Sequence, residues 1–565
     1  MNVVKIEGGL KTQSKCRAIY GGIFLLALAF IFCSPAARAQ IDSGAITGTL
    51  RDDQGAVLSG ASVAIRNIAT GVTSTTKTNT DGTYQVLALI PGTYSVEARA
   101  AGFGAAKTTG VEIHVQTRAQ IDFTLHVGTV QSQVEVQADT VQLQTNSADV
   151  GTVIGANQIN DLPLNSRRYA DLALLSPGVF KNPSVANSAP DRFSSNGNLE
   201  TQNYFALDGV DNNSGSTNLQ EGSVQNVQPP PDAIQEFRLQ TRTYSTEFGA
   251  SAGAVINASV KSGTNEFHGN VWEYARNSIF DANTFLNRQN GIPKGTFSQN
   301  QFGGTLGGPI YRNRMFFFGD YQGLRSAQQV TKLSVVPSHN MKNGDFSELD
   351  PSVYPFLSLA TGQAGCLNAA TRIIAPSCLD PVGMKLGALY PDPNLPGATV
   401  WTGNPNYQFV YNSPTQVNSA DGRLDFKISE RDSVFGRYSY LKQHRQDPPW
   451  TSNPIAGNGG FATDYNIRNQ GLALGWTHIF SASAVNQARF GFSRDNAVSG
   501  PIGLTLGKSN AGDFGLTGIP ASAFTAGIPP MYISGLVTLG VDRFRPQFQV
   551  AQVFQFIDTF TKLQG

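Results

Sequence analysis

The stretch Arg423–Ile428 (RLDFKI) alternates a charged side chain with an apolar one at every position. Leu472–Thr477 (LALGWT) and Ala488–Ser493 (ARFGFS) repeat this period of two, and Val434–Tyr440 (VFGRYSY) ends in aromatic residues. Successive side chains of a β-strand point to opposite faces, so the pattern predicts strands with one apolar face. Strands that cross an outer membrane look like this, with aromatic residues at the interfaces. Strands of a soluble sandwich alternate too, so the period alone does not separate the two architectures.

The composition of the whole chain favours a mainly β protein with several domains. Of 565 residues, 40% are apolar, only 14% are charged and 59 are Gly. This mixture has too little charge for a disordered chain and too many polar residues for a helical membrane protein. The 41 basic and 40 acidic residues give a net charge of +1. Such a balance lacks the basic field of a nucleic-acid-binding protein, so we expect no nucleic acid as a partner.

Residues 1–39 have the pattern of a cleaved signal peptide. An apolar run, Ile19–Phe32, is followed by the small residues of Ala37–Ala39 and a cleavage point before Gln40. The basic residues ahead of the run are Lys11, Lys15 and Arg17. A transmembrane anchor is the alternative, but a spanning helix requires ~20 apolar residues. No stretch of that length follows residue 40, so a membrane location requires β-strands.

Two cysteines remain after this segment, Cys366 and Cys378. They lie twelve residues apart in a stretch rich in Gly, Pro and Asn, and an exported protein meets oxidising conditions. We therefore predict a disulfide that closes a surface loop. A metal-binding pair is the alternative, but the spacing is wrong for zinc and no His is near.

Residues 40–128 predict a small antiparallel β-sandwich, because short β runs alternate with turns at regular spacing. The seven expected strands are Ala45–Arg51, Ala61–Asn67, Val72–Thr78, Thr83–Ala88, Gly92–Ala100, Gly110–Val115 and Arg118–His126. Its motifs, in order, are GAITGTLRD (44–52), GASV (60–63), TDGTY (80–84), PGTYSV (91–96) and GF (102–103). This series resembles the carboxypeptidase regulatory-like domain, which implies a transthyretin-like fold of the carbohydrate-binding-like group.

The name of that domain raises the possibility of a zinc peptidase. Such a site needs a His and a Glu close together on one element and a second His. The six histidines, His114, His126, His268, His339, His444 and His478, include none followed by Glu three residues later. We therefore expect an accessory domain, with no catalytic residues, no metal and no cofactor.

Residues 129–264 differ in pattern and include helical signals at Asn157–Leu162 and Ser166–Leu175, where Ser166 is the expected N-cap. Two later segments are more specific: Leu207-Asp208-Gly209-Val210 and Ser262–Gly269 (SGTNEFHG). These segments, in this order, resemble the plug of TonB-dependent receptors of the Oar-like group, a mixed α/β domain inside the barrel. The polar cluster Asp208, Asp211, Asn212 and Asn213 also has the donors of a cation site, but turn chemistry is the simpler interpretation.

The same resemblance points to a contact with the periplasmic energy-coupling protein TonB. The candidate residues are Gln133, Val134, Glu135, Val136, Gln137 and Ala138. An exposed extended segment offers its backbone N–H and C=O groups to a partner strand. The segment departs from the Thr- and Val-rich pattern usual in the family, and the alternative is a plain linker strand after the sandwich.

Residues 265–565 are expected to form the N-terminal part of a transmembrane antiparallel β-barrel, with nine or ten strands. Gln301–Ile310 (QFGGTLGGPI) and Arg314–Arg325 (RMFFFGDYQGLR) resemble the early barrel of Oar-like receptors. Ser338–Asn406 and Arg445–Asn466 have the length of extracellular loops. The family closes its barrel with 22 strands, and an open edge cannot face lipid. We therefore expect the sequence to be a piece of a longer receptor.

The resemblance implies an outer-membrane transporter for the uptake of a large or scarce ligand of the siderophore, glycan or peptide class. Its partners are a TonB-type energy-coupling protein, outer-membrane lipid and an unknown extracellular ligand. One alternative is an outer-membrane adhesion or surface-organising protein without transport. A second is a soluble exported carbohydrate-binding protein, which accounts poorly for the aromatic alternation after residue 420.

Overall fold

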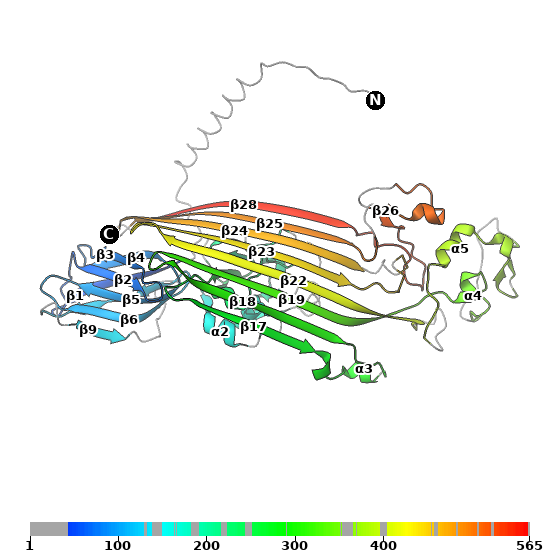
Figure 1. Ribbon diagram of the computed structural model, residues 1–565, viewed down its shortest axis with the longest axis horizontal. Helices are drawn as coiled ribbons and strands as arrows, with labels where there is room; N and C mark the ends of the chain where they lie inside the picture. Colours follow the sequence, from blue (N-terminus) through cyan, green and yellow to red (C-terminus); the bar gives the residue numbers. More distant parts are fainter. Residues whose placement is uncertain are drawn as a thin grey trace, which may run out of the picture.

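The computed structural model shows three bodies of β structure in series along the chain (Figure 1). It describes residues 43–128, 133–137, 150–162, 164, 167–181, 191–215, 223–242, 244, 251–289, 291–350, 352, 365–368, 370–395, 404–453, 455–456, 462–481, 484–504, 508–520 and 525–562. The expected signal peptide, 1–39, lies outside these residues. None of the helices in the described part of the chain has the length and apolar character needed to cross a membrane.

The first body is a β-sandwich of two sheets. Its strands are β1 (Gly44–Asp52), β2 (Ser62–Asn67), β3 (Thr73–Lys77), β4 (Thr83–Leu89), β5 (Gly92–Arg99), β6 (Ala105–Ile113), β7 (Arg118–Gln120), β8 (Phe123–Leu125) and β9 (Gln133–Gln137). One sheet has the order β4-β1-β7, with β8 also on β1, and the other has β3-β2-β5-β6-β9. Alternate residues such as Ile46, Val63 and Val96 are buried between them.

The sandwich differs from the sequence expectation in two places. The sixth strand begins at Ala105, not Gly110, because Gly110 adopts φ +79° within a bulge and the strand continues on both sides of it. The expected last strand is split into β7 and β8, where the Asp122 side chain accepts a hydrogen bond from Thr49 N at 2.7 Å. Both halves pair parallel to β1, and β9 pairs parallel to β6, so the sandwich is not purely antiparallel.

The second body, which we call the plug, is a mixed domain between residues 150 and 262. Its strands are β10 (Val150–Gly155), β11 (Val179–Phe180), β12 (Ser194–Ser195), β13 (Tyr204–Leu207), β14 (Val210–Asp211), β15 (Ile234–Arg242) and β16 (Val255–Val260). Its helical elements are α2 (Ala156–Asp161) and the 3-10 turns η1 (Tyr169–Leu175), η2 (Glu200–Gln202) and η3 (Pro231–Ala233). Five strands form one sheet, β10-β15-β16-β13-β14.

The helix expected at Ser166–Leu175 is a 3-10 turn that begins at Tyr169. Ser166 lies outside the described residues. The observed N-cap is Arg168, which makes no side-chain cap hydrogen bond. Four apolar residues of this turn are buried in the plug core. Tertiary packing therefore stabilises the turn, and a side-chain cap does not.

The third body, which we call the wall, is an eight-stranded antiparallel sheet in sequence order. Its strands are β17 (His268–Asn277), β18 (Phe297–Tyr311), β19 (Met315–Ser334), β22 (Tyr407–Lys427), β23 (Asp432–Asp447), β24 (Thr463–Ser481), β25 (Ala484–Pro501) and β28 (Gln547–Lys562). The expectation of nine or ten strands is therefore too high for the described residues. The other described strands of this region are two residues long and form two small separate sheets. One pairs β20 (Leu367–Asn368) with β21 (Ile373–Ile374), and the other pairs β26 (Lys508–Ser509) with β27 (Ala526–Gly527).

The wall confirms the predicted alternation. Arg423 and Asp425 are buried on the face toward the plug, whereas Leu424 is 47% exposed on the opposite face. Trp476, Phe554 and Phe556 are exposed on that same outer face. Packing of the plug against the inner face is direct, because Phe318 and Leu441 of the wall belong to the plug's core cluster.

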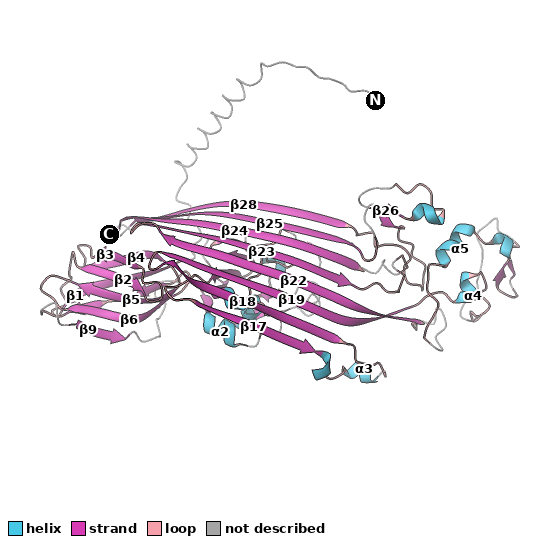
Figure 2. Ribbon diagram, viewed as in Figure 1, coloured by secondary structure: helices cyan, strands magenta, loops and turns pink. Residues whose placement is uncertain are grey.

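The two ends of the wall are different (Figure 1). Short turns join the strands at the end beside the sandwich, and Lys427 Nζ donates to Thr73 O there at 2.7 Å. At the other end, long segments form a compact layer that we call the cap, and Figure 2 shows its short helices. They are α4 (His339–Lys342), η5 (Pro376–Cys378), α5 (Pro381–Gly387) and η6 (Ala511–Phe514), while η4 (Ser278–Phe280) and α3 (Phe285–Gln289) follow β17.

Candidate functional site

The predicted motif Leu207-Asp208-Gly209-Val210 forms a tight hairpin between β13 and β14. Leu207 and Val210 pair directly, so Asp208 and Gly209 are the two turn residues. Both have positive φ, +53° and +74°. Asp-Gly is the usual choice for such a turn, because Asp tolerates the left-handed region and Gly adopts it without strain. The turn directs the Asp208 side chain toward the wall.

Asp208 is fully buried, and its carboxylate lies between two arginines of the wall. Arg423 Nη1 (β22) donates to Oδ1 at 2.8 Å, and Arg437 Nε (β23) lies 2.7 Å from Oδ2 as an ion pair. Val260 N of the plug also donates to Oδ1, at 3.0 Å. One plug carboxylate thus joins two adjacent strands of the wall in a fully buried site, where such interactions are strong.

The two arginines have further partners, which fix their orientation. Arg423 binds Asp425 through two parallel hydrogen bonds of 2.9 Å and stacks on Phe435 with its guanidinium carbon 4.9 Å from the ring centre. Arg437 donates to Ser439 Oγ, which in turn donates to Asp421. We call these residues the plug–wall cluster: Asp208, Asp421, Arg423, Asp425, Arg437 and Ser439.

The polar group suspected of cation binding is not one site. Asp208 faces the wall, whereas Asp211 Oδ1 accepts two hydrogen bonds of 2.7 Å from Asn213 within the turn. Asn212 bonds the backbone of Val227. Burial raises the pKa of Asp211, and the two Asn213 donors partly oppose this. Turn chemistry therefore accounts for these residues. In the described part of the chain, no group of three or more His, Cys, Asp or Glu side chains is arranged to hold a metal ion.

A second junction joins the sandwich to the plug through Glu236 of β15, which is only 4% exposed. Its carboxylate accepts a hydrogen bond from Val115 N and lies 2.6 Å from His114 Nδ1. Arg238 Nη1 donates to Gln116 O at 2.6 Å. The hydrogen bond to Glu236 raises the pKa of His114, and partial burial opposes the shift. His114 thus has a specific partner in the plug, which strand periodicity alone did not predict.

The segment expected to contact TonB lies at the margin of the sandwich. Residues 133–137 form β9, the last strand in the order β3-β2-β5-β6-β9, and Ala138 lies outside the described residues. Within the described chain, β9 pairs on one side only, with β6. Its other backbone edge faces away from the sheet.

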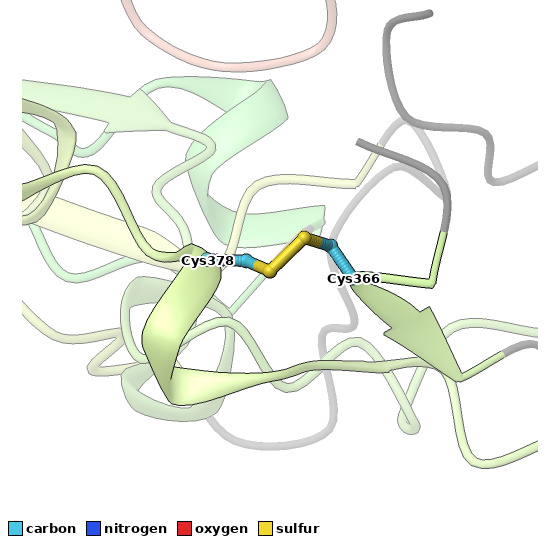
Figure 3. Close-up of a disulfide and its surroundings, with 2 residues drawn as sticks. All are labelled: Cys366 and Cys378. Carbon is cyan, nitrogen blue, oxygen red and sulfur yellow. A yellow bond between two sulfur atoms is a disulfide. The ribbon is translucent and has the colours of Figure 1, made fainter. Parts of the chain in front are cut away.

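The cap contains the two cysteines, and the structure joins Cys366 to Cys378 in a disulfide (Figure 3). The Cα atoms are 5.7 Å apart, which suits this bond. Beside this loop lies a cavity of about 430 Å³, within the size range of small-molecule sites. Its apolar lining includes Met341, Phe346, Leu379 and Leu536. No local sequence pattern predicts this cavity, because its lining comes from segments almost 200 residues apart.

Most residues of the plug–wall cluster were not predicted as a site. Asp208 was predicted as part of a plug motif, and Arg423 and Asp425 as the polar face of a strand, but a contact between them was not predicted. Charged residues at inward positions of the alternating strands are the signal that identifies Arg423, Asp421 and Arg437. Their partner in the plug has no such signal.

Comparison with known proteins matches two parts of the chain. The family described as "Outer membrane beta barrel domain" matches residues 259–565, and "Carboxypeptidase regulatory-like domain" matches residues 45–126. The TonB-dependent transporter Oar of Myxococcus xanthus is 26% identical over 274 residues, which cover 46% of this chain and 24% of that protein. The chain therefore matches about a quarter of the length of this curated relative.

Among solved structures, the outer membrane transporter YddB from Escherichia coli is 12% identical, with a TM-score of 0.44. The similarity covers 72% of this chain and 45% of that one. The siderophore receptor PirA from Acinetobacter baumannii is 14% identical, with a TM-score of 0.40, and covers 72% and 44%. The relatives compared here are named as transporters and receptors, not as enzymes.

Proposed function

Because the chain belongs to the outer membrane β-barrel domain family, we propose that the protein acts in TonB-dependent uptake through the outer membrane. The family locates the protein in that membrane. The observation that supports uptake is the plug–wall cluster, in which buried Asp208 holds the plug on the inner face of the wall. In a closed barrel, a plug held in this way would block passage until it moved, and that movement would need a source of energy.

The proposed contact for a TonB-type protein is β9, residues 133–137. Its edge away from β6 carries no strand in the described residues, and an extended segment with an open edge suits strand addition. The segment also lies in the link between the sandwich and the plug, so a force applied there reaches the plug through the chain. The alternative of a plain linker strand predicts no partner at this edge.

The ligand is proposed to belong to the siderophore, glycan or peptide class, and to bind on the cap side. The relatives' names support a transported ligand, since PirA is a siderophore receptor. The cap cavity beside the disulfide offers an apolar surface for part of such a ligand. The proposed function is transport without covalent chemistry, so it assigns no catalytic residues.

Binding of the cell's own TonB C-terminal domain to the receptor, extracted from its outer membrane in detergent, tests the proposal. Neighbouring N–H groups of a strand point to opposite edges, so Val134→Pro and Glu135→Pro together remove a donor from each edge of β9. We expect the variant that loses its outer N–H to bind TonB at least tenfold more weakly. The matched controls Val134→Ala and Glu135→Ala keep both donors.

If both proline variants bind TonB as the alanine controls do, β9 is not the contact. If the unmodified receptor binds no TonB at all, energy-coupled uptake is wrong, and the adhesion or surface-organising function becomes the better account. The soluble carbohydrate-binding alternative does not fit a member of this family with an exposed aromatic face on its wall.

A further inference from the structure

One row of polar residues crosses the inner face of the wall and ends in two members of the plug–wall cluster, Asp421 and Ser439. The row follows the strand register, each residue opposite the next: Asn270, Thr305, Asp320, Asp421 and Ser439. Asp320 and Asp421, on neighbouring strands β19 and β22, are only 8% and 7% exposed. Directly opposite residues in an antiparallel pair have Cβ atoms ~5 Å apart, so the two carboxylates meet.

The hydroxyl and amide donors in the row bind acceptors other than Asp320. Thr305 Oγ1 donates to Asn270 Oδ1, and Asn270 Nδ2 donates to Asp232 of the plug at 2.6 Å. At the other end, Ser439 Oγ donates to Asp421 Oδ1. Neither oxygen of Asp320 receives a hydrogen bond from the described residues. A buried carboxylate in this state is unstable unless a positive group neutralises it.

Two further buried oxygens without partners lie on the same face. Gln322 and Ser419 are directly opposite each other, two residues along β19 and β22 from the aspartates. Gln322 Oε1 and Ser419 Oγ have no hydrogen-bond partner in the described chain, and Ser419 is 4% exposed. Residues two apart on a strand share a face ~7 Å apart. The four residues therefore occupy the corners of a small rectangle on the inner face of the wall.

The neighbouring arginines neutralise only part of the negative charge around this rectangle. Arg423 is held by Asp208 and Asp425, and Arg437 by Asp208 and Ser439. Arg167 pairs with Asp232. The plug–wall cluster with Asp320 thus brings four aspartates together with two arginines, Arg423 and Arg437. A proton shared by Asp320 and Asp421 would provide a partner for the two carboxylates. It would leave the Gln322 and Ser419 oxygens without one.

We propose that Asp320, Gln322, Ser419 and Asp421 bind a calcium ion on the inner face of the wall. Carboxylate, amide and hydroxyl oxygens are hard donors that suit Ca²⁺, which takes six to eight oxygens and completes its shell with water. The two pairs of residues lie almost a hundred positions apart in the sequence, so no local motif marks them. The ion would bind beside the plug, and the site stands whether or not the protein transports a ligand.

Calcium titration of the whole protein, extracted in detergent and treated with a chelator, tests the site. We expect one Ca²⁺ per chain by calorimetry, with a dissociation constant of about 10⁻⁴–10⁻³ M as in extracellular modules. Asp320→Asn is expected to weaken binding at least tenfold and to abolish the rise in unfolding temperature that Ca²⁺ produces. Asp81→Asn, in an exposed turn of the sandwich, makes the same charge change and should behave as the unmodified protein.

Asp320→Asn removes a buried negative charge, so we expect it to fold. Ser419→Ala is the second variant, because it removes one neutral oxygen without changing the charge, and it should weaken binding severalfold. Equal calcium binding by the unmodified protein, Asp320→Asn and Ser419→Ala would overturn the site. The absence of a calcium effect on the unmodified protein would overturn it too, and would indicate that the aspartates share a proton.

Discussion

The plug is held by two junctions that use different chemistry. Toward the wall, Asp208 is fully buried and meets two arginines that are 6% and 2% exposed. Toward the sandwich, Glu236 accepts a backbone N–H and contacts His114, whose side chain is 36% exposed. Full charges without water bind strongly only when every charge has a partner, whereas a hydrogen-bonded, partly exposed pair tolerates change. The wall junction therefore behaves as a unit, and the sandwich junction as an adjustable contact.

We expect the largest loss of plug stability from a substitution at Asp208. Asp208→Asn removes the carboxylate that pairs with Arg437 and one of the two that pair with Arg423, so we expect a loss of about 3–5 kcal/mol in the stability of the docked plug. The measurement is the denaturant midpoint for protease cleavage within the plug, on the detergent-extracted protein. Asp211→Asn in the same hairpin is the matched control, and should cost less than about 1 kcal/mol because the Asp211 carboxylate accepts its hydrogen bonds from Asn213 in the same turn.

A double variant sharpens this test. Asp208→Asn combined with Arg437→Gln removes one charge of each sign, so part of the lost stability should return. If the single variant is as stable as the Asp211→Asn control, the buried ion pairs do not hold the plug. The wall junction would then depend on the apolar contacts of Phe318 and Leu441.

The sandwich junction should give a smaller effect. Glu236→Ala leaves Val115 N without its acceptor at a buried position, which costs about 1–3 kcal/mol. Hydrogen exchange at Val115 and its neighbours is the measurement, since the amide should become less protected while the plug core does not change. Glu112→Ala is the control, because Glu112 is exposed and lies 3.7 Å from His114 without a contact to the plug. Unchanged protection at Val115 in Glu236→Ala would contradict the assigned hydrogen bond.

The sequence predicted the elements far better than their contacts. Alternation in Arg423–Ile428 correctly predicted which side chains of β22 face inward, because strand periodicity is a local property. It could not identify Asp208 as their partner, since that residue lies 215 positions earlier and only the packing of plug on wall brings them together. The start of the sixth strand was predicted wrongly for a different reason. A glycine often marks the boundary of a strand, but Gly110 has a positive φ and forms a bulge within β6.

The smallest effect is the pH dependence of the sandwich junction. Glu236 raises the pKa of His114 above its usual 6.5, so the protonated histidine binds more tightly in the docked state than in the undocked one. The added stability is complete below the unperturbed pKa and is lost as pH rises through the raised value. We expect less than about 1 kcal/mol, because His114 is more than one-third exposed and solvent screens the pair.

Hydrogen exchange at Val115 between pH 5 and 9, corrected for the intrinsic pH dependence of exchange, measures this loss. His114→Gln should abolish the dependence. His126→Gln should not abolish it, since His126 pairs with Asp53, which also belongs to the sandwich. A pH dependence that persists in His114→Gln would assign the titration to another group, and His114 would then not be the source of the pH response at the sandwich junction.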